Sequence, residues 1–261
     1  MILLLSDLHL GRGTTDQSRA AERDVLDLLR AHEAEIVEEG STLVLNGDVF
    51  HEFIEYRHLV PKVGARLTGF LADWADRGAE ILYVVGNRDP WHIDFFETEI
   101  GVRVIPTSIT LDAFGQRVFI SHGDQHAYTH RLSLRFESIV RAPWAARLYR
   151  MALPGDSGFA LARWASRTFG TDGVPDPVVA RDLAAAAHRQ LEATDADVVV
   201  FGHSHGEALE VTPHGTYINL GYWYGARTFA RIDANGPALF RWTNGAANPL
   251  AMPPVAAPLP T

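Results

Sequence analysis

Five short apolar runs in this chain each end in a polar cluster. The runs are residues 2–5, 42–45, 81–85, 118–120 and 198–201. The clusters are Asp7-Leu8-His9, Gly47-Asp48, Gly86-Asn87-Arg88-Asp89, His122-Gly123-Asp124 and Gly202-His203-Ser204-His205. Short apolar runs bounded by turn residues are typical of buried strands. Because α/β sheets place their ligand sites at the carboxyl ends of strands, the pattern predicts one site assembled from several strand ends.

The segments between the first three runs have helical spacing. Apolar residues recur at three- and four-residue intervals from Ala21 to Ile36 and from Val63 to Trp74, and a glycine follows each segment. Strands that alternate with helices in this way predict right-handed parallel crossovers. Beyond residue 102 we expect shorter strands, a helix that begins at Asp176-Pro177, one more core strand and a meander. The chain is therefore expected to be an α/β protein.

Residues 126–172 lose the strand pattern and carry large apolar side chains among arginines. Pro143 and Pro154 are expected to divide this segment into two or three amphipathic helices that form a lid. Between residues 131 and 167 the sequence has seven arginines and two acidic residues, a balance of +5, in a chain of net charge −9. Two interpretations fit such a segment: a solvated basic helix face, or a surface that meets an anionic partner.

The length of 261 residues suits one large domain. We expect that domain to span residues 1–245, with a Pro- and Ala-rich, disordered tail at 246–261. The chain has no cysteine, which excludes disulfides and thiolate metal sites. We find neither a signal peptide pattern nor an apolar stretch of about 18 residues, so a cytoplasmic protein is expected. The negative charge argues against nucleic acid as a partner.

The polar clusters contain Asp, Asn and His, which together suit manganese, iron or zinc. The candidate ligands are Asp7, His9, Asp48, Asn87, His122, His203 and His205. Seven ligands are too many for one ion and suit two ions that share a carboxylate. In Asp-x-His and His-x-His, residues two apart on an extended strand end face the same side. The alternative is that Gly-Asp and Gly-Asn are turn residues, which explains the glycines but not four histidines at strand ends.

The motifs Asp-x-His, Gly-Asp, Gly-Asn-x-Asp, His-Gly and Gly-His-x-His, in this order over about residues 1–232, resemble the calcineurin-like metallophosphoesterases. The resemblance implies a four-layer α-β-β-α sandwich with a helical lid insertion. It implies one ion held by Asp7, His9, Asp48 and His205, and a second held by Asp48, Asn87, His122 and His203. The two ions, manganese by preference and iron or zinc as alternatives, would share a hydroxide that attacks phosphorus in line. Asp89 and Asp124 are candidates to orient the imidazoles, or are ordinary turn residues.

Arg88 stands where many members of this superfamily have a histidine that protonates an alkoxide leaving group. Arginine stays protonated and cannot donate that proton, but its planar fork binds phosphate. A leaving phosphate monoester needs no proton, because its second pKa is about 6. Asp48, Asn87 and Arg88 are the catalytic candidates, with Asn87, Arg88 and His203 as substrate contacts, and a diphosphate is the expected substrate class. The alternative is that Arg88 pairs with Asp89.

Gly-Asn-Arg-Asp at residues 86–89 also resembles the UDP-2,3-diacylglucosamine pyrophosphatases of lipid A synthesis, as do the segments 47–50, 122–124 and 141–144. This branch implies an amphipathic, lipid-linked sugar nucleotide as substrate. It also implies a lid that receives acyl chains, and we expect that lid to contact the inner face of the membrane. The alternative is that the apolar lid residues only pack on the core.

Three features depart from the branch. They are Tyr128-Thr129-His130 in place of Thr-Asp-Asp, no recognisable serine- and lysine-bearing segment after the lid, and Gly206-Glu207 in place of Arg-Pro. A general phosphodiesterase or phosphomonoesterase acting on nucleotides or other small phosphoesters is therefore the second functional hypothesis. A binding scaffold without metals would lack some of the ligands, and none is missing.

Overall fold

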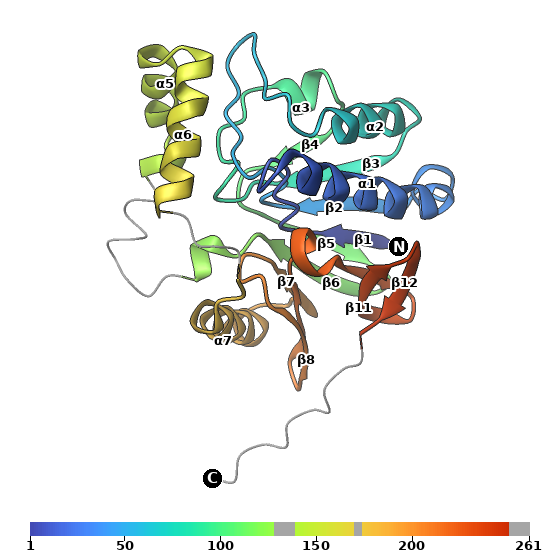
Figure 1. The fold of residues 1–261 in the computed structure, drawn as a ribbon. Helices are drawn as coiled ribbons and strands as arrows, with labels where there is room; N and C mark the ends of the chain where they lie inside the picture. Colours follow the sequence, from blue (N-terminus) through green and yellow to red (C-terminus); the bar gives the residue numbers. More distant parts are fainter. Residues whose placement is uncertain (128–138, 170–173, 251–261) are drawn as a thin grey trace.

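Two β-sheets lie face to face at the centre of the molecule, with helices on both outer faces (Figure 1). The computed structural model describes residues 1–127, 139–169 and 174–250. The expected four-layer α/β architecture is confirmed.

The first sheet has the strand order β12-β11-β10-β1-β2-β3-β4. Its parallel half consists of β1 (Ile2–Leu5), β2 (Thr42–Asn46), β3 (Glu80–Val84) and β4 (Arg103–Ile105). Its antiparallel half consists of β10 (Thr228–Asp233), β11 (Gly236–Thr243) and β12 (Ala246–Pro249). The parallel half ends in three of the five polar clusters.

Strand β12 corrects the expected start of the disordered tail. Residues 246–249 pair antiparallel with β11 instead of leaving the domain. The cause is the Asn244-Gly245 turn, in which both residues have positive φ (54° and 75°). This conformation is typical of a tight hairpin turn, and Asn-Gly is its strongest sequence signal. The rest of the expected tail, residues 251–261, lies outside the described residues.

The second sheet has the order β5-β6-β7-β9-β8. Its strands are β5 (Ser108–Ala113), β6 (Gln116–Ser121), β7 (Val198–Phe201), β8 (Glu207–Thr212) and β9 (Gly215–Leu220). The central strands β6, β7 and β9 are parallel. The other two clusters follow β6 and β7, so both sheets contribute strand ends to one region.

The helical layers follow from the alternation of side chains along the strands. Leu3 and Leu5 of β1 pack in the core beneath α1 (Thr15–Ala31) and α2 (Ala65–Asp76), whereas Ile2 and Leu4 pack against the second sheet. Helix α7 (Pro177–Ala193) covers the other sheet and has the expected Asp176 cap. The remaining short helices are a π-helical turn (Ala34–Glu38), α3 (Phe95–Thr98), a 3₁₀ turn (Asp124–His126) and α8 (Trp223–Ala226).

Helices α5 (Pro143–Ala152) and α6 (Gly155–Phe169) lie side by side at one end of the molecule, apart from the sheets (Figure 1). They are divided at Pro154, as the sequence predicts. Polar contacts join this region to the core: Trp91 Nε1 donates to the carbonyl of Val140, which precedes α5 (2.7 Å), and Arg150 of α5 donates to the Glu55 carbonyl (3.2 Å). None of the helices in the described ranges is long and apolar enough to cross a membrane.

Candidate metal centre

The loops after β1 and β2 are joined by backbone hydrogen bonds that continue the strand pairing beyond the sheet. Asp7 N donates to the Gly47 carbonyl (3.1 Å), His9 N to the Asp48 carbonyl (2.9 Å) and Leu10 N to the Val49 carbonyl (3.0 Å). The first two polar clusters therefore lie side by side because their backbones are paired.

Five of the seven candidate ligands have left-handed backbone conformations. The φ angles are 55° at Asp7, 43° at His9, 52° at Asp48, 64° at His203 and 59° at His205. Such angles are uncommon for residues other than glycine and concentrate at functional sites. The expectation of extended Asp-x-His and His-x-His segments is thus wrong. The strands end earlier, at Leu5 and Phe201, and turns aim the side chains.

Two motif glycines allow backbone and side chains to approach closely. A Cβ on Gly86 would lie 2.2 Å from Asp48 Oδ1, and a Cβ on Gly202 would lie 2.8 Å from Asp7 Oδ2. Neither residue has a positive φ. At these two positions glycine therefore serves the packing of the carboxylates, and the alternative that treats the motif glycines purely as turn residues does not apply.

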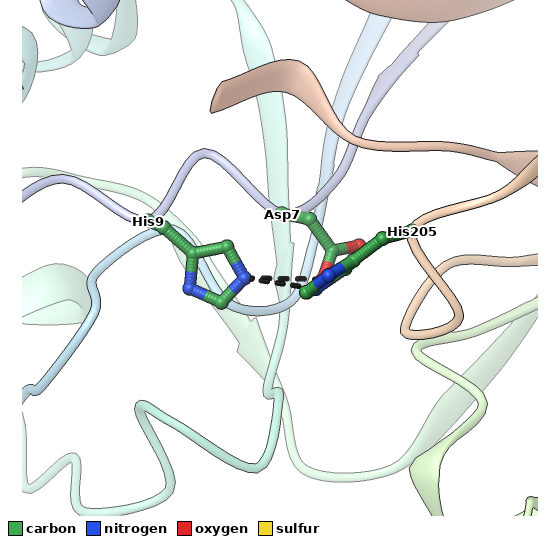
Figure 2. A group of neighbouring side chains, drawn as sticks. All are labelled: Asp7, His9 and His205. Atoms are coloured by element: carbon green, nitrogen blue, oxygen red, sulfur yellow. Dashed lines mark hydrogen bonds and ion pairs between the residues drawn. The ribbon is translucent and has the colours of Figure 1, made fainter. Parts of the chain in front are cut away.

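Asp7, His9 and His205 form a first group of converging ligand atoms (Figure 2). Asp7 Oδ1 lies 3.5 Å from His9 Nε2 and 3.2 Å from His205 Nε2, and the two nitrogens are 3.1 Å apart. All three side chains point toward a common position between the β1 and β7 loops. One carboxylate oxygen and two imidazole nitrogens in this arrangement could hold a divalent ion.

Asp7, Asp48 and His122 form a second group. Asp48 Oδ1 lies 3.5 Å from His122 Nε2, while Asp48 Oδ2 lies 3.8 Å from His9 Nε2. The Asp48 carboxylate therefore faces both groups. Asp7 also belongs to both, so the two groups share carboxylates.

Buried polar atoms without partners test whether the site fits metal ions. Asp7 Oδ1, Asn87 Oδ1 and His122 Nε2 are buried and have no hydrogen-bond partner within the described part of the chain. Buried polar atoms are normally hydrogen-bonded. All three atoms belong to candidate ligands, and each has a lone pair that a cation could use. The seventh candidate, His203, packs edge-on against His122 with ring centroids 5.3 Å apart.

Electrostatics at the site also favour a cation. Burial, with the charges of Asp89 and Asp7, raises the pKa of Asp48 to about 7, although His122 opposes the shift. Burial lowers the pKa of His122, but the charges of Asp48, Asp7 and Asp124 outweigh it and raise that pKa to about 9. Burial lowers the pKa of His9 and of His203 to about 4. The crowded carboxylates attract positive charge, as the raised pKa of His122 shows, and the imidazoles of His9 and His203 beside them are neutral. Such an environment suits a divalent ion.

Asp89 does not orient an imidazole, contrary to one interpretation of the sequence. Its fully buried carboxylate accepts hydrogen bonds from the backbone of Gly86 (2.9 Å), Asp48 (3.3 Å) and Val49 (2.8 Å) and from the Tyr83 hydroxyl (2.5 Å). It thereby fixes the loop that presents Asp48.

Asp124 pairs with Arg141 at the base of the lid. The imidazole of His122 is oriented by another group, since its Nδ1 lies 2.9 Å from the Asn46 carbonyl. The Ser6 hydroxyl similarly donates to Asp7 Oδ2 (2.6 Å). We did not predict Ser6 or Asn46, although each is a polar residue at the end of an apolar run, directly before a motif, and that position was the available signal.

Arg88 connects the strand ends with the lid. Its backbone N donates to Asp48 Oδ1 (2.8 Å), and its guanidinium donates to the Ser166 hydroxyl of α6 (2.7 Å). The carboxylate of Asp89 accepts hydrogen bonds from backbone N–H groups, and the guanidinium of Arg88 contacts Ser166. Among the described residues, the alternative Arg88–Asp89 ion pair is therefore not formed. The sequence did not point to Ser166 as a functional residue, because the serine-bearing segment was expected after the lid, whereas Ser166 lies inside the last helix of the lid. The three-residue spacing of Arg163 and Ser166, which places them on neighbouring helical positions, was the available signal.

A cavity of about 510 Å³ lies between the loop that follows the first motif and the lid. It begins at Leu10 and Gly11, directly after His9, and extends to Phe159 and Arg163 of α6. The lid therefore forms one wall of a cavity whose other wall begins at the residue after His9.

Comparison with known proteins defines the class. A family model described as calcineurin-like phosphoesterase matches residues 1–207, and the chain belongs to that family. It is therefore a hydrolase of the metallophosphoesterase class, as the motif order predicts.

Individual known proteins are also similar to this chain. The chain is 31% identical to a UDP-2,3-diacylglucosamine hydrolase of Porphyromonas gingivalis over 59% of this chain and 57% of that protein. It is 27% identical to the enzyme of the same name from Neisseria gonorrhoeae over 89% of this chain and 94% of that protein. Among solved structures, the phosphoesterase Yfce from E. coli aligns with a TM-score of 0.48 at 16% identity, covering 97% of this chain and 99% of that chain.

Proposed function

We propose that this chain is a two-metal phosphoesterase whose ions share the carboxylate of Asp48. One ion would be held by Asp7, His9, Asp48 and His205. The other would be held by Asp48, Asn87, His122 and His203. Manganese is the preferred metal, with iron or zinc as alternatives. The observation that carries the proposal is the Asp48 carboxylate, whose two oxygens face His122 and His9 at 3.5 and 3.8 Å.

Different residues of the chain would have different roles around these ions. When bound, such ions supply a nucleophile from water at neutral pH and offset the charge on the phosphoryl group. Asn87 and His203 lie in the same group of strand ends, where they would contact the phosphoryl oxygens. Arg88 would bind the leaving phosphate with its guanidinium, and Ser166 holds that guanidinium in place (2.7 Å). Arg88 does not need to donate a proton if the leaving group is a phosphate monoester.

The proposed substrate is the diphosphate of an amphipathic sugar nucleotide, similar to UDP-2,3-diacylglucosamine. Two observations support this choice. The relatives with the highest similarity reported above carry that substrate in their names. The cavity beside the lid is bounded by Arg163, which suits phosphate, and by Phe159, which suits an apolar chain or a base.

A hydrolysis panel with manganese tests the proposal. It compares a lipid-linked UDP-sugar, a plain UDP-sugar, a cyclic nucleotide and an aryl phosphate, each with the wild-type chain and with Asp48→Ala as the blank. We expect the lipid-linked UDP-sugar to have the highest kcat/KM. Faster turnover of the cyclic nucleotide or aryl phosphate would instead favour a general phosphodiesterase or phosphomonoesterase.

We also propose that the lid contacts the inner face of the cytoplasmic membrane. Trp144, Leu148 and Met151 follow helical spacing along α5 and are 60%, 59% and 85% exposed. Arg147 is exposed beside them, in a chain that is acidic overall. An apolar stripe with basic neighbours is typical of helices that lie on anionic bilayers.

Vesicle sedimentation tests this contact. The wild-type chain should sediment with vesicles that contain anionic lipid and remain free with purely zwitterionic vesicles, whereas a Trp144→Ser, Leu148→Ser double variant should lose binding. Val211→Ser is the control, because Val211 is also an exposed apolar residue but lies on β8, outside the lid. Equal sedimentation of the double variant and the wild type would contradict the proposal.

A further inference from the structure

His51 lies beside the candidate metal ligand His9, although it belongs to no motif. Its backbone N donates to the Leu10 carbonyl (2.9 Å), which adds one more link to the hydrogen bonds between the β1 and β2 loops. The two imidazole rings meet edge to face, with centroids 5.5 Å apart. His51 Nδ1 lies 3.4 Å from His9 Nδ1. The side chain of His51 is only 14% exposed.

The geometry of His9 determines which of its nitrogens carries hydrogen. Its Nε2 lies in the first group, 3.5 Å from Asp7 Oδ1 and 3.1 Å from His205 Nε2. A nitrogen that binds an ion carries no hydrogen, so the hydrogen of His9 must be on Nδ1. Histidine ligands of metals almost always donate that second N–H to a fixed acceptor.

We propose that His51 is a positioning residue for the metal ligand His9: its Nδ1 accepts the His9 Nδ1–H and fixes the ring. His51 then carries its own hydrogen on Nε2. That nitrogen faces Glu52 Oε1 at 3.5 Å. The result is a chain of three side chains, His9, His51 and Glu52, that runs from the first group of ligand atoms to the cavity wall, which Glu52 helps to line. The inference rests on the proposed metal centre.

The surroundings of His51 keep its acceptor lone pair available. His51 Nε2 lies 3.5 Å from Glu52 Oε1, so the carboxylate favours the hydrogen on Nε2 and leaves the lone pair on Nδ1. A neutral imidazole can accept the hydrogen bond, whereas an imidazolium could only donate. Unlike a carboxylate, a neutral acceptor fixes the orientation of His9 without adding negative charge next to the ion.

Three variants of His51 separate this role from simple packing. His51→Asn places an amide oxygen near the position of Nδ1 and keeps an acceptor. His51→Phe keeps a planar ring of similar shape and removes the acceptor. His51→Ala removes the acceptor without adding bulk and replaces the Phe variant should that variant fold poorly. His188→Phe is the control, because His188 pairs with Glu210 on the outer layer (2.9 Å).

The measurement is manganese binding to the full chain after treatment with a chelator, by elemental analysis and by competition with a chelator of known affinity. We expect His51→Phe to lower the affinity for one of the two manganese ions by about 10–100-fold and to leave the affinity for the other unchanged. We expect His51→Asn to bind within about threefold of wild type, since it retains a hydrogen-bond acceptor. The unfolding temperature of the metal-free chain should not change.

Wild-type affinity for both ions in His51→Phe and His51→Ala would overturn the inference, as would equal weakening in His51→Asn and His51→Phe. A wild-type chain that binds fewer than two ions would instead contradict the proposed centre. The two failures are therefore distinguishable.

Discussion

The strand-end centre and the helical lid are built in opposite ways. Asp7, Asp48 and His122 are at most 2% exposed, and paired loop backbones and buried acceptors hold them. The described part of the lid exposes Trp144, Leu148 and Met151 by more than half and meets the core through polar side-chain contacts such as those of Arg88 and Arg150. The rigid sheet edge can therefore fix reactive geometry, whereas the exposed lid surface places fewer constraints on its side chains.

The largest expected effect comes from the shared carboxylate. Asp48→Ala should remove both ions and reduce turnover by at least about 10²–10³-fold, because the phosphoryl charge then lacks its stabilising groups. Elemental analysis and steady-state kinetics measure both quantities. Asp112→Ala, on an exposed carboxylate of β5, is the control. Retained activity with a metal content near two would show that the centre does not depend on Asp48.

Arg88→His tests the residue that joins the two regions. Cleavage of the diphosphate should fall about 10–100-fold, because a charge-assisted hydrogen bond to phosphate is lost. Hydrolysis of an ester with an alkoxide leaving group should rise about tenfold or more, because histidine can donate a proton. Kinetics with both substrates decide the outcome. Unchanged diphosphate cleavage without a gain on the alkoxide ester would refute the leaving-group argument.

Ser166→Ala should have a smaller effect that separates the lid from the centre. Loss of the hydroxyl leaves Arg88 less well positioned, so KM for the diphosphate should rise about 3–10-fold while the metal content stays at the wild-type value. Ser157→Ala, an exposed serine on the same helix, should leave KM unchanged. A metal content that falls with Ser166→Ala would mean that the lid supports the ions, and the two regions would not be independent.

The smallest expected effect concerns the pH dependence of the metal-free chain. The pKa values of His9 and His203 are about 4 when folded, against 6.5 ordinarily. Between these values the unfolded chain binds protons that the folded chain does not, so the free energy of unfolding falls as the pH decreases. Asp48, whose pKa is raised from 3.8 to about 7, acts in the opposite direction throughout this range, so the dependence measured is the difference between these effects.

Urea unfolding at pH 6.5, 5.5 and 4.5 measures that dependence. His203→Asn should lose less free energy of unfolding than wild type over this interval, by on the order of 1–2 kcal/mol. His188→Asn serves as the reference. An acid dependence in His203→Asn as steep as in wild type would show that His203 does not titrate as its burial implies.

The sequence predicted the centre better than the lid for a physical reason. Buried strands have a strong apolar signal, so β2 was predicted at Thr42–Asn46 and its polar end was placed correctly. Carboxyl ends of neighbouring parallel strands meet at one edge of a sheet, which accounts for Asp7 and Asp48 after β1 and β2. His122 follows β6 of the second sheet and joins them because the two sheets are stacked. The motif order then identified the family.

The sequence did not reveal how those side chains are aimed. Left-handed turns at His9 and His205 depend on pairing between distant loops, and spacing alone does not encode that pairing. Ser166 and His51 are likewise functional candidates only because tertiary contacts place them beside Arg88 and His9. Strand β12 was missed for a different reason, since its Asn-Gly turn was visible in the sequence and was outweighed by the Pro- and Ala-rich composition that follows.

Anomalous X-ray diffraction from manganese-loaded crystals of the full chain tests the central claim most directly. Two peaks are expected, one among Asp7, His9, Asp48 and His205 and the other among Asp48, Asn87, His122 and His203, with the Asp48 carboxylate between them. A single peak, or two peaks that do not share Asp48, would contradict the proposed two-metal centre.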